Sequence, residues 1–162
     1  MKLLKPYAFL LLSIAALLSC NKYRVYDKYN DIPQSLWYAD STLTYTFEIA
    51  DSIYAYHILY NIRYSISYPY HNIYIKYKLY DTQNNELKSD LQFMDLLHPT
   101  TGEPLGAGTG DIFNINYYAL KNYKFAKSGK YKITLTQYMR QDPLPEILSV
   151  GIRVDKSTEM LK

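Results

Sequence analysis

The chain has 162 residues, of which 20 are tyrosine and one is cysteine, and its formal net charge at pH 7 is +3. This length suits one domain with a self-sufficient core, and a single cysteine excludes an intramolecular disulfide. Because no strongly basic face is evident from so small a charge, we expect no nucleic-acid partner.

The first 20 residues have the pattern of a bacterial lipoprotein signal peptide. Lys2 and Lys5 form a positive start, an almost wholly apolar stretch covers residues 7–18, and the small Ser19 precedes Cys20. The apolar stretch is shorter than the roughly 20 residues that cross a bilayer, and this order of features is typical of a secretory signal. The final letters LLSC resemble the lipobox, in which the cysteine becomes the first mature residue and carries lipid.

Cys20 is therefore the predicted lipidation site, with palmitate among the expected acyl groups; the alternative is an ordinary signal peptide with a chance cysteine. One acyl chain gives only marginal membrane binding, and stable anchoring takes at least two, which a lipobox cysteine supplies. A lipid-blocked cysteine cannot act as a nucleophile, because that role requires a thiolate. The sequence thus predicts a signal peptide over residues 1–19 and a domain anchored in the cell envelope, facing the periplasm, on either the inner or the outer membrane.

The segment after the cysteine is polar and shows no sustained hydrophobic period. Without residues 1–19 the chain has 16 basic and 15 acidic residues and is nearly neutral. We interpret residues 20–40 as the lipidated N-terminus and a tether, with Trp37 docked at the edge of the domain. The folded domain is expected over residues 41–156, followed by a tail over residues 157–162.

Apolar side chains then recur at every second position, which is the pattern of β-strands. Within residues 53–67 the expected inward side chains are Tyr54, Tyr56, Ile58, Tyr60, Ile62, Tyr64 and Ile66. Turns and a loop at 97–110, with two prolines and four glycines, separate the segments. About seven or eight strands predict an all-β fold, an antiparallel β-sandwich of the Ig-like or jelly-roll kind. The expected strands cover residues 41–50, 53–67, 73–81, 87–96, 111–120, 131–139 and 147–155.

The glycine-rich part of the 97–110 loop is the first candidate for chemistry. It lacks the Lys-Ser/Thr of a phosphate-binding loop, and a strand rather than a helix follows it. Glu103 and Asp111 could hold Ca²⁺, but two carboxylates without a fixed ligand spacing favour a structural loop. His57, His71 and His98 have no zinc-site spacing, and no Gly-x-Ser-x-Gly elbow occurs. We therefore expect no enzyme, metal, cofactor or small-molecule substrate.

Two surface features are candidates for interaction. Lysines gather at positions 121, 124, 127, 130 and 132, where a solvated hairpin rim is the ordinary interpretation and anionic lipid headgroups are the alternative. Outward tyrosines offer a large contact area with a polar tip, although strand propensity and core filling account for most of the 20. The predicted partner surface comprises Tyr68, Tyr70, Tyr74, Gly106, Gly108, Gly110 and Asp111.

Four segments in this order resemble the gliding motility lipoprotein GldH family: RVYD at residues 24–27, YPYHNIY at 68–74, LGAGTGDI at 105–112 and Met139-Arg140. The family pattern has leucine where this chain has Ile73. The resemblance implies a non-catalytic envelope lipoprotein that works beside the gliding and type IX secretion machinery, and it adds no functional residue beyond Cys20. The alternative function is a glycan-binding envelope lipoprotein that uses exposed tyrosines, an argument from fold analogy.

Overall fold

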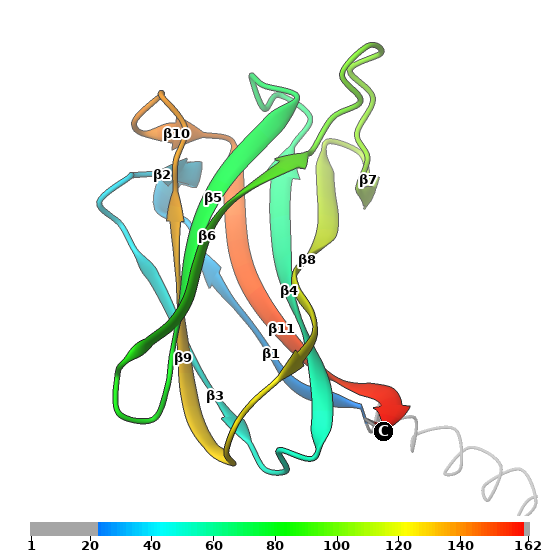
Figure 1. Cartoon of the computed structure of the whole chain (residues 1–162). Coiled ribbons are helices and arrows are strands. Elements are labelled where there is room, and N and C mark those ends of the chain that lie inside the picture. Colours follow the sequence, from blue (N-terminus) through cyan, green and yellow to red (C-terminus); the bar gives the residue numbers. More distant parts are fainter. Residues whose placement is uncertain (1–22, 161–162) are drawn as a thin grey trace, which may run out of the picture.

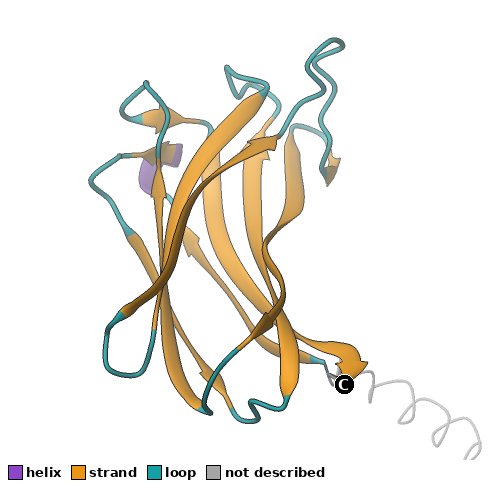
Figure 2. Ribbon diagram, viewed as in Figure 1, coloured by secondary structure: helices purple, strands orange, loops and turns teal. Residues whose placement is uncertain are grey.

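The computed structural model describes residues 23–160, and these form a β-sandwich of two principal sheets (Figure 1). The predicted signal peptide and Cys20 lie outside the described residues. Figure 2 shows that strands dominate and that loops join them at both ends of the sandwich. None of the helices within residues 23–160 has the length and apolar character needed to cross a bilayer.

The larger sheet has five antiparallel strands in the order β1-β11-β4-β8-β7. Its centre is the long strand β4, which pairs with β11 on one side and with β8 on the other. The strands are β1 (Arg24–Asp31), β4 (Tyr54–Ser65), β7 (Ala107–Thr109), β8 (Ile112–Lys124) and β11 (Ile147–Met160).

The smaller principal sheet has four antiparallel strands in the order β3-β9-β5-β6, so that β3 and β6 are its edges. A short 3-10 helix η2 (Pro33–Ser35) leads into a two-stranded ladder of β2 (Leu36–Trp37) and β10 (Leu144–Pro145). The four strands are β3 (Leu43–Ile49), β5 (Asn72–Tyr80), β6 (Glu86–Asp95) and β9 (Gly129–Gln137).

The core lies between the two principal sheets and is built from the alternating side chains of their strands. Buried side chains alternate with more exposed ones along β3, β5 and β9, which confirms the all-β sandwich. Tyrosine contributes heavily, because its ring fills the core while its hydroxyl can reach a main-chain carbonyl. The fully buried aromatic side chains include Trp37, Tyr45, Tyr56, Tyr60, Tyr64 and Tyr77.

The predicted tether is wrong for residues 24–31, because they form β1 and pair with β11 along the edge of the larger sheet. The sequence shows no alternation here because most side chains of this edge strand are exposed and the main chain makes the ladder. Trp37 is also misplaced by the prediction: it is fully buried, and its Nε1 donates a 3.0 Å hydrogen bond to the carbonyl oxygen of Ser41. The domain therefore starts near Arg24 rather than at residue 41.

The predicted tail and strand count also need correction. Strand β11 continues to Met160, which pairs with Tyr54, and Ser157 is buried, so the tail does not begin at residue 157. The described residues, 23–160, form eleven strands instead of seven or eight, because β1 lacks an apolar period and β2, β7 and β10 are too short to show one. Ile66 is exposed rather than inward, since β4 ends at Ser65 and the chain turns there.

Candidate functional site

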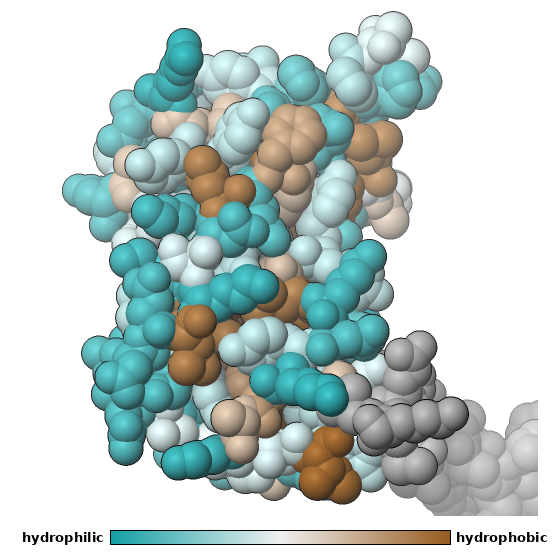
Figure 3. Space-filling model, in the orientation of Figure 1, coloured by the Kyte–Doolittle hydropathy of each residue, from teal (hydrophilic) through white to brown (hydrophobic). Residues whose placement is uncertain are grey.

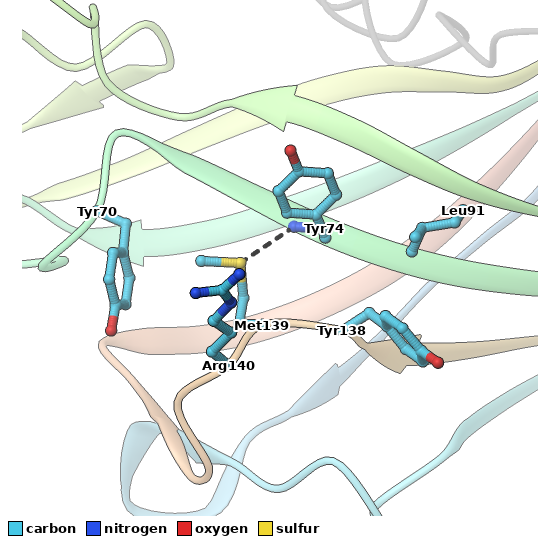
Figure 4. A pocket seen from close by; sticks show the side chains of 6 residues that line it. All are labelled: Tyr70, Tyr74, Leu91, Tyr138, Met139 and Arg140. Atoms are coloured by element: carbon cyan, nitrogen blue, oxygen red, sulfur yellow. Dashed lines mark hydrogen bonds between the residues drawn. The ribbon is translucent and has the colours of Figure 1, made fainter.

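A groove lies on the outer face of the four-stranded sheet, where the chain leaves β9 and where β5 begins. Its volume is about 390 Å³. Figure 3 shows this face of the molecule as separate apolar patches among hydrophilic side chains. We call it the aromatic groove, and Figure 4 shows the side chains that line it: Tyr70, Tyr74, Leu91, Tyr138, Met139 and Arg140.

Strand alternation places the groove's aromatic side chains outward. Tyr74 stands between the buried Ile73 and Ile75, and its cross-strand partner on β6 is Phe93. The two rings lie 5.5 Å apart between centroids. The exposed fraction of Tyr138 is 57%, and Phe93 and Leu91 are exposed as well. An exposed apolar cluster with a polar rim is typical of an interaction site.

Hydrogen bonds hold the segment after β9 against the start of β5. The main-chain N–H of Tyr138 donates to the carbonyl oxygen of Tyr74 at 2.8 Å. The N–H of Tyr74 in turn donates to the sulfur of Met139 at 3.3 Å, the dashed line in Figure 4. The hydroxyl of Tyr70 donates to Oε1 of Gln141 at 2.6 Å. Residues that are far apart in the sequence, around 70–74 and 138–141, therefore form one wall.

The groove carries positive charge beside its aromatic side chains. The ammonium of Lys76 lies 5.7 Å from the ring centroid of Tyr138, within the range of a cation–π contact. Arg140 is exposed, and its guanidinium has no hydrogen bond or ion pair with another residue of the 23–160 segment. Lys78, further along β5, is paired with Glu86 at 3.1 Å, and this carboxylate raises the pKa of the lysine.

Two of the three predicted surface tyrosines, Tyr70 and Tyr74, line the groove, but the prediction for Tyr68 is wrong. Tyr68 is only 3% exposed, and its ring packs between those of Tyr64 and Tyr70. The β4–β5 turn folds this side chain over the end of the core, where its hydroxyl donates to the carbonyl oxygen of Asn72 at 2.9 Å. The predicted partner surface did not include Tyr138, although this residue continues the outward alternation of Lys132, Thr134 and Thr136.

The predicted glycine residues lie on the other sheet and do not join the groove. A Cβ on Gly106 would lie 2.6 Å from the carbonyl oxygen of Asn114, and one on Gly108 would meet the carbonyl oxygen of Ile112. Gly110 has φ +66°, in the left-handed region that favours glycine. The β7–β8 hairpin thus accounts for these glycines. Asp111, beside them, accepts a hydrogen bond from the N–H of Ile66 at its main-chain oxygen.

The histidines are separate surface or half-buried groups. His57 makes an edge contact with Tyr118, and His71 lies 3.9 Å from a carboxylate oxygen of Asp95. Within residues 23–160 no group of three His, Cys, Asp or Glu side chains could hold a metal ion.

Comparison with known proteins identifies the family of this chain. The family model described as GldH lipoprotein matches residues 24–154. A gliding motility lipoprotein GldH homolog of Christiangramia forsetii is 34% identical over 146 residues, covering 86% of this chain and 88% of the relative. The gliding motility lipoprotein GldH of Flavobacterium johnsoniae is 30% identical over 160 residues, covering 94% and 98%.

Similarity to solved structures is lower. The VP2 subviral particle of infectious bursal disease virus matches with a TM-score of 0.40 and 14% identity, over 83% of this chain and 33% of the viral chain. That score is too low to support a functional argument.

Proposed function

Because the chain belongs to the GldH lipoprotein family, we propose that it is a lipid-anchored, non-catalytic component of the gliding motility apparatus or its associated secretion machinery. In this proposal Cys20 carries the lipid, and the aromatic groove binds a partner protein of the envelope. The observation that carries the proposal is the exposed cluster of Tyr138, Phe93 and Leu91 beside the unpaired Arg140.

The position of β1 supports an anchor close to the domain. Three residues lie between Cys20 and Arg24, the first residue of β1. An extended chain spans at most about 3.6 Å per residue, so the four steps from Cys20 to Arg24 reach about 14 Å. The N–H of Lys156 donates to the carbonyl oxygen of Tyr23, which fixes the residue before β1 beside the last part of β11. The sandwich would then stand directly on the membrane rather than on a long tether.

The same end of the sandwich carries side chains that suit a membrane surface. Ile53, in the β3–β4 turn, is 66% exposed. Lys124 pairs with Ala55 just beyond this turn, and Lys127 lies in the neighbouring β8–β9 hairpin. Exposed lysines near a lipid anchor attract anionic headgroups, and this supports the headgroup alternative for the lysine cluster.

The aromatic groove lies at the opposite end. Strand β9 starts at Gly129, opposite Ile49 near the anchor, and runs away from it to Gln137. Tyr138 follows directly and contacts the start of β5. A domain held at its β1 end would therefore present the groove away from the membrane, where another envelope protein can reach it.

The chemistry of the groove indicates the kind of segment that binds. Its aromatic and aliphatic lining suits an apolar anchor side chain, and Arg140 together with Lys76 suits a carboxylate next to that anchor. Strand β6 pairs only with β5 among the described strands, so its outer edge offers free main-chain groups beside the groove. The proposed occupant is an extended, acidic segment of a partner protein that adds alongside β6.

Photo-crosslinking in living cells tests this surface. A photoreactive residue replaces Tyr138 in one strain and Tyr118 in another; Tyr118 is a matched control because it is exposed on the other sheet. We expect a discrete adduct with one envelope protein at position 138 only, and we expect Arg140→Glu to remove it. Equal adducts at both positions, or an adduct that persists in Arg140→Glu, would rule the groove out.

A further inference from the structure

A second hollow lies on the outer face of the five-stranded sheet, and its lining is more polar than that of the aromatic groove. Its volume is about 280 Å³. Four strands contribute side chains to it, namely β1, β4, β8 and β11. We call it the polar hollow, and its main polar and aromatic side chains are Tyr29, Asp31, Asn61, Arg63, Asn114, Asn116 and Ser149.

The strand register arranges these side chains in two neighbouring rows across the sheet. In one row Tyr29 is opposite Gly151, Gly151 is opposite Asn61, and Asn61 is opposite Asn116. The next row runs through Asp31, Ser149, Arg63 and Asn114. Adjacent strands are about 4.8 Å apart and alternate residues about 7 Å apart, which are the dimensions of a sugar ring and its substituents.

Gly151 gives the hollow an aromatic floor. A Cβ at this glycine would lie 2.7 Å from Cδ1 of Tyr29 and 3.0 Å from its Cγ, so the tyrosine ring covers the glycine backbone. Tyr29 as a whole residue is nevertheless 53% exposed. A ring laid on a sheet with its outer side open is an apolar platform, and the C–H face of a pyranose fits such a platform.

Unused hydrogen-bonding groups surround that platform. Asn61 is 3% exposed although it lies on the outer face of the sheet, and its Nδ2 donates a 3.3 Å hydrogen bond to Asp27. An amide can make up to four hydrogen bonds, which leaves Asn61 with capacity to spare. Arg63 and Asn116 make no side-chain hydrogen bond or ion pair with other described residues. Donors and acceptors are thus both available, as the hydroxyl groups of a sugar require.

The charge balance of this face argues against an anionic ligand. Arg24 is paired with Asp27, and Arg153 with Asp155. Asp31 lies in the same row as Arg63. Binding of a nucleic-acid phosphate backbone needs several free cations. A protein interface needs several apolar anchors, whereas Tyr29 is the exposed aromatic residue among the lining residues named above.

We propose that the polar hollow binds a neutral hexopyranose chain of the cell envelope. Tyr29 stacks on one sugar ring, while Asn61, Asn116 and Arg63 bond its hydroxyl or acetamido groups. This activity goes beyond the proposed partner binding and does not depend on it, because the polar hollow and the aromatic groove lie on the outer faces of different sheets and can be occupied together.

Calorimetric titration of the full-length chain in detergent tests the inference, with three probes: the N-acetylglucosamine hexamer, cellohexaose and polygalacturonate. We expect saturable binding of at least one neutral hexamer. Tyr29→Leu should weaken it about tenfold, and Asn116→Ala about threefold to tenfold, as for loss of an aromatic contact or of one neutral hydrogen bond.

Two matched variants complete the test. Tyr29→Phe keeps the ring and should bind like the wild type. Tyr118→Leu, at an exposed position of the same sheet that does not line the polar hollow, should also leave sugar binding unchanged. Failure of both neutral hexamers to bind, binding of polygalacturonate alone, or unchanged affinity in Tyr29→Leu and Asn116→Ala would each overturn the proposal. None of these results bears on crosslinking at Tyr138, so the two proposals fail separately.

Discussion

The hydroxyl of Tyr45 donates a 2.6 Å hydrogen bond to the main-chain carbonyl oxygen of Val150 and thereby links β3 of one sheet to β11 of the other. Tyr64 also bonds a main-chain acceptor, donating to the carbonyl oxygen of Leu96 at 2.6 Å. These tyrosines fill the sandwich and also satisfy buried main-chain acceptors. The high tyrosine content is therefore first a property of the core and only secondly a property of the proposed binding surfaces.

Replacing Tyr45 by phenylalanine should lower the free energy of unfolding. The ring remains, but the carbonyl oxygen of Val150 loses a partner inside the core, which costs about 0.5–1.5 kcal/mol. Tyr138→Phe is the matched control, because that side chain is exposed and the change should be close to zero. Urea unfolding measures both; equal stability of Tyr45→Phe and wild type would contradict the role of this bond.

Alkaline pH should unfold the protein. Burial raises the pKa of Tyr45, Tyr60 and Tyr68 well above 10, and burial, aided by Asp90, raises that of Tyr77 to about 12. A raised folded-state pKa contributes stability that is fully present below pH 10 and is lost as pH rises through the folded value. The urea midpoint should hold steady up to pH 10 and fall above it. Ionisation of all 20 tyrosines near pH 10 while the protein stays folded would contradict the raised pKa values of these buried tyrosines.

The β7–β8 hairpin should tolerate change at one glycine and not at another. In Gly108→Ala the new Cβ meets the backbone of Ile112, an overpacking that costs about 1–3 kcal/mol. Gly110→Asn should cost much less, since no atom lies within 4 Å of a Cβ there and asparagine adopts the left-handed conformation more readily than most residues. Thermal melting compares the two variants, and a reversed order would show that the glycines serve a different purpose.

Deleting residues 24–31 should unfold or strongly destabilise the domain. These residues form β1, which pairs with β11 from Arg24 to Asp31. A flexible insertion directly after Asn21 is the control, because it lengthens the link to Cys20 without touching the ladder. Circular dichroism and thermal melting report the result. A deletion variant as stable as the wild type would mean that the segment is a tether after all.

The sequence predicts those strands in which buried apolar side chains alternate with exposed polar ones. Tyr45, Phe47 and Ile49 show the period of a strand with one buried face, and so their orientation was predictable. β1 is an edge strand with most of its side chains exposed, so no apolar period marks it. Trp37 is buried by a two-residue ladder with β10, and a ladder that short leaves no pattern in the sequence.

The two candidate sites also differ in how far the sequence predicts them. Tyr74 stands at an outward position of a clear strand, and part of the aromatic groove could therefore be predicted. Tyr68 occupies a turn, where alternation gives no direction. The polar hollow depends on the register that sets Tyr29 beside Gly151 and Asn61, and those pairings join segments more than 30 residues apart in the chain, which periodicity along one strand does not encode.

The most direct test of the account is complementation of a strain that lacks the gene, scored for both spreading over surfaces and protein export. The strain receives the wild type, Cys20→Ala, Tyr138→Ser with Arg140→Glu, or Tyr118→Ser. We predict that loss of the gene abolishes spreading or export, that the wild type and Tyr118→Ser restore it, and that the anchor and groove variants do not. Normal spreading and normal export in the strain without the gene would contradict the proposed role in motility.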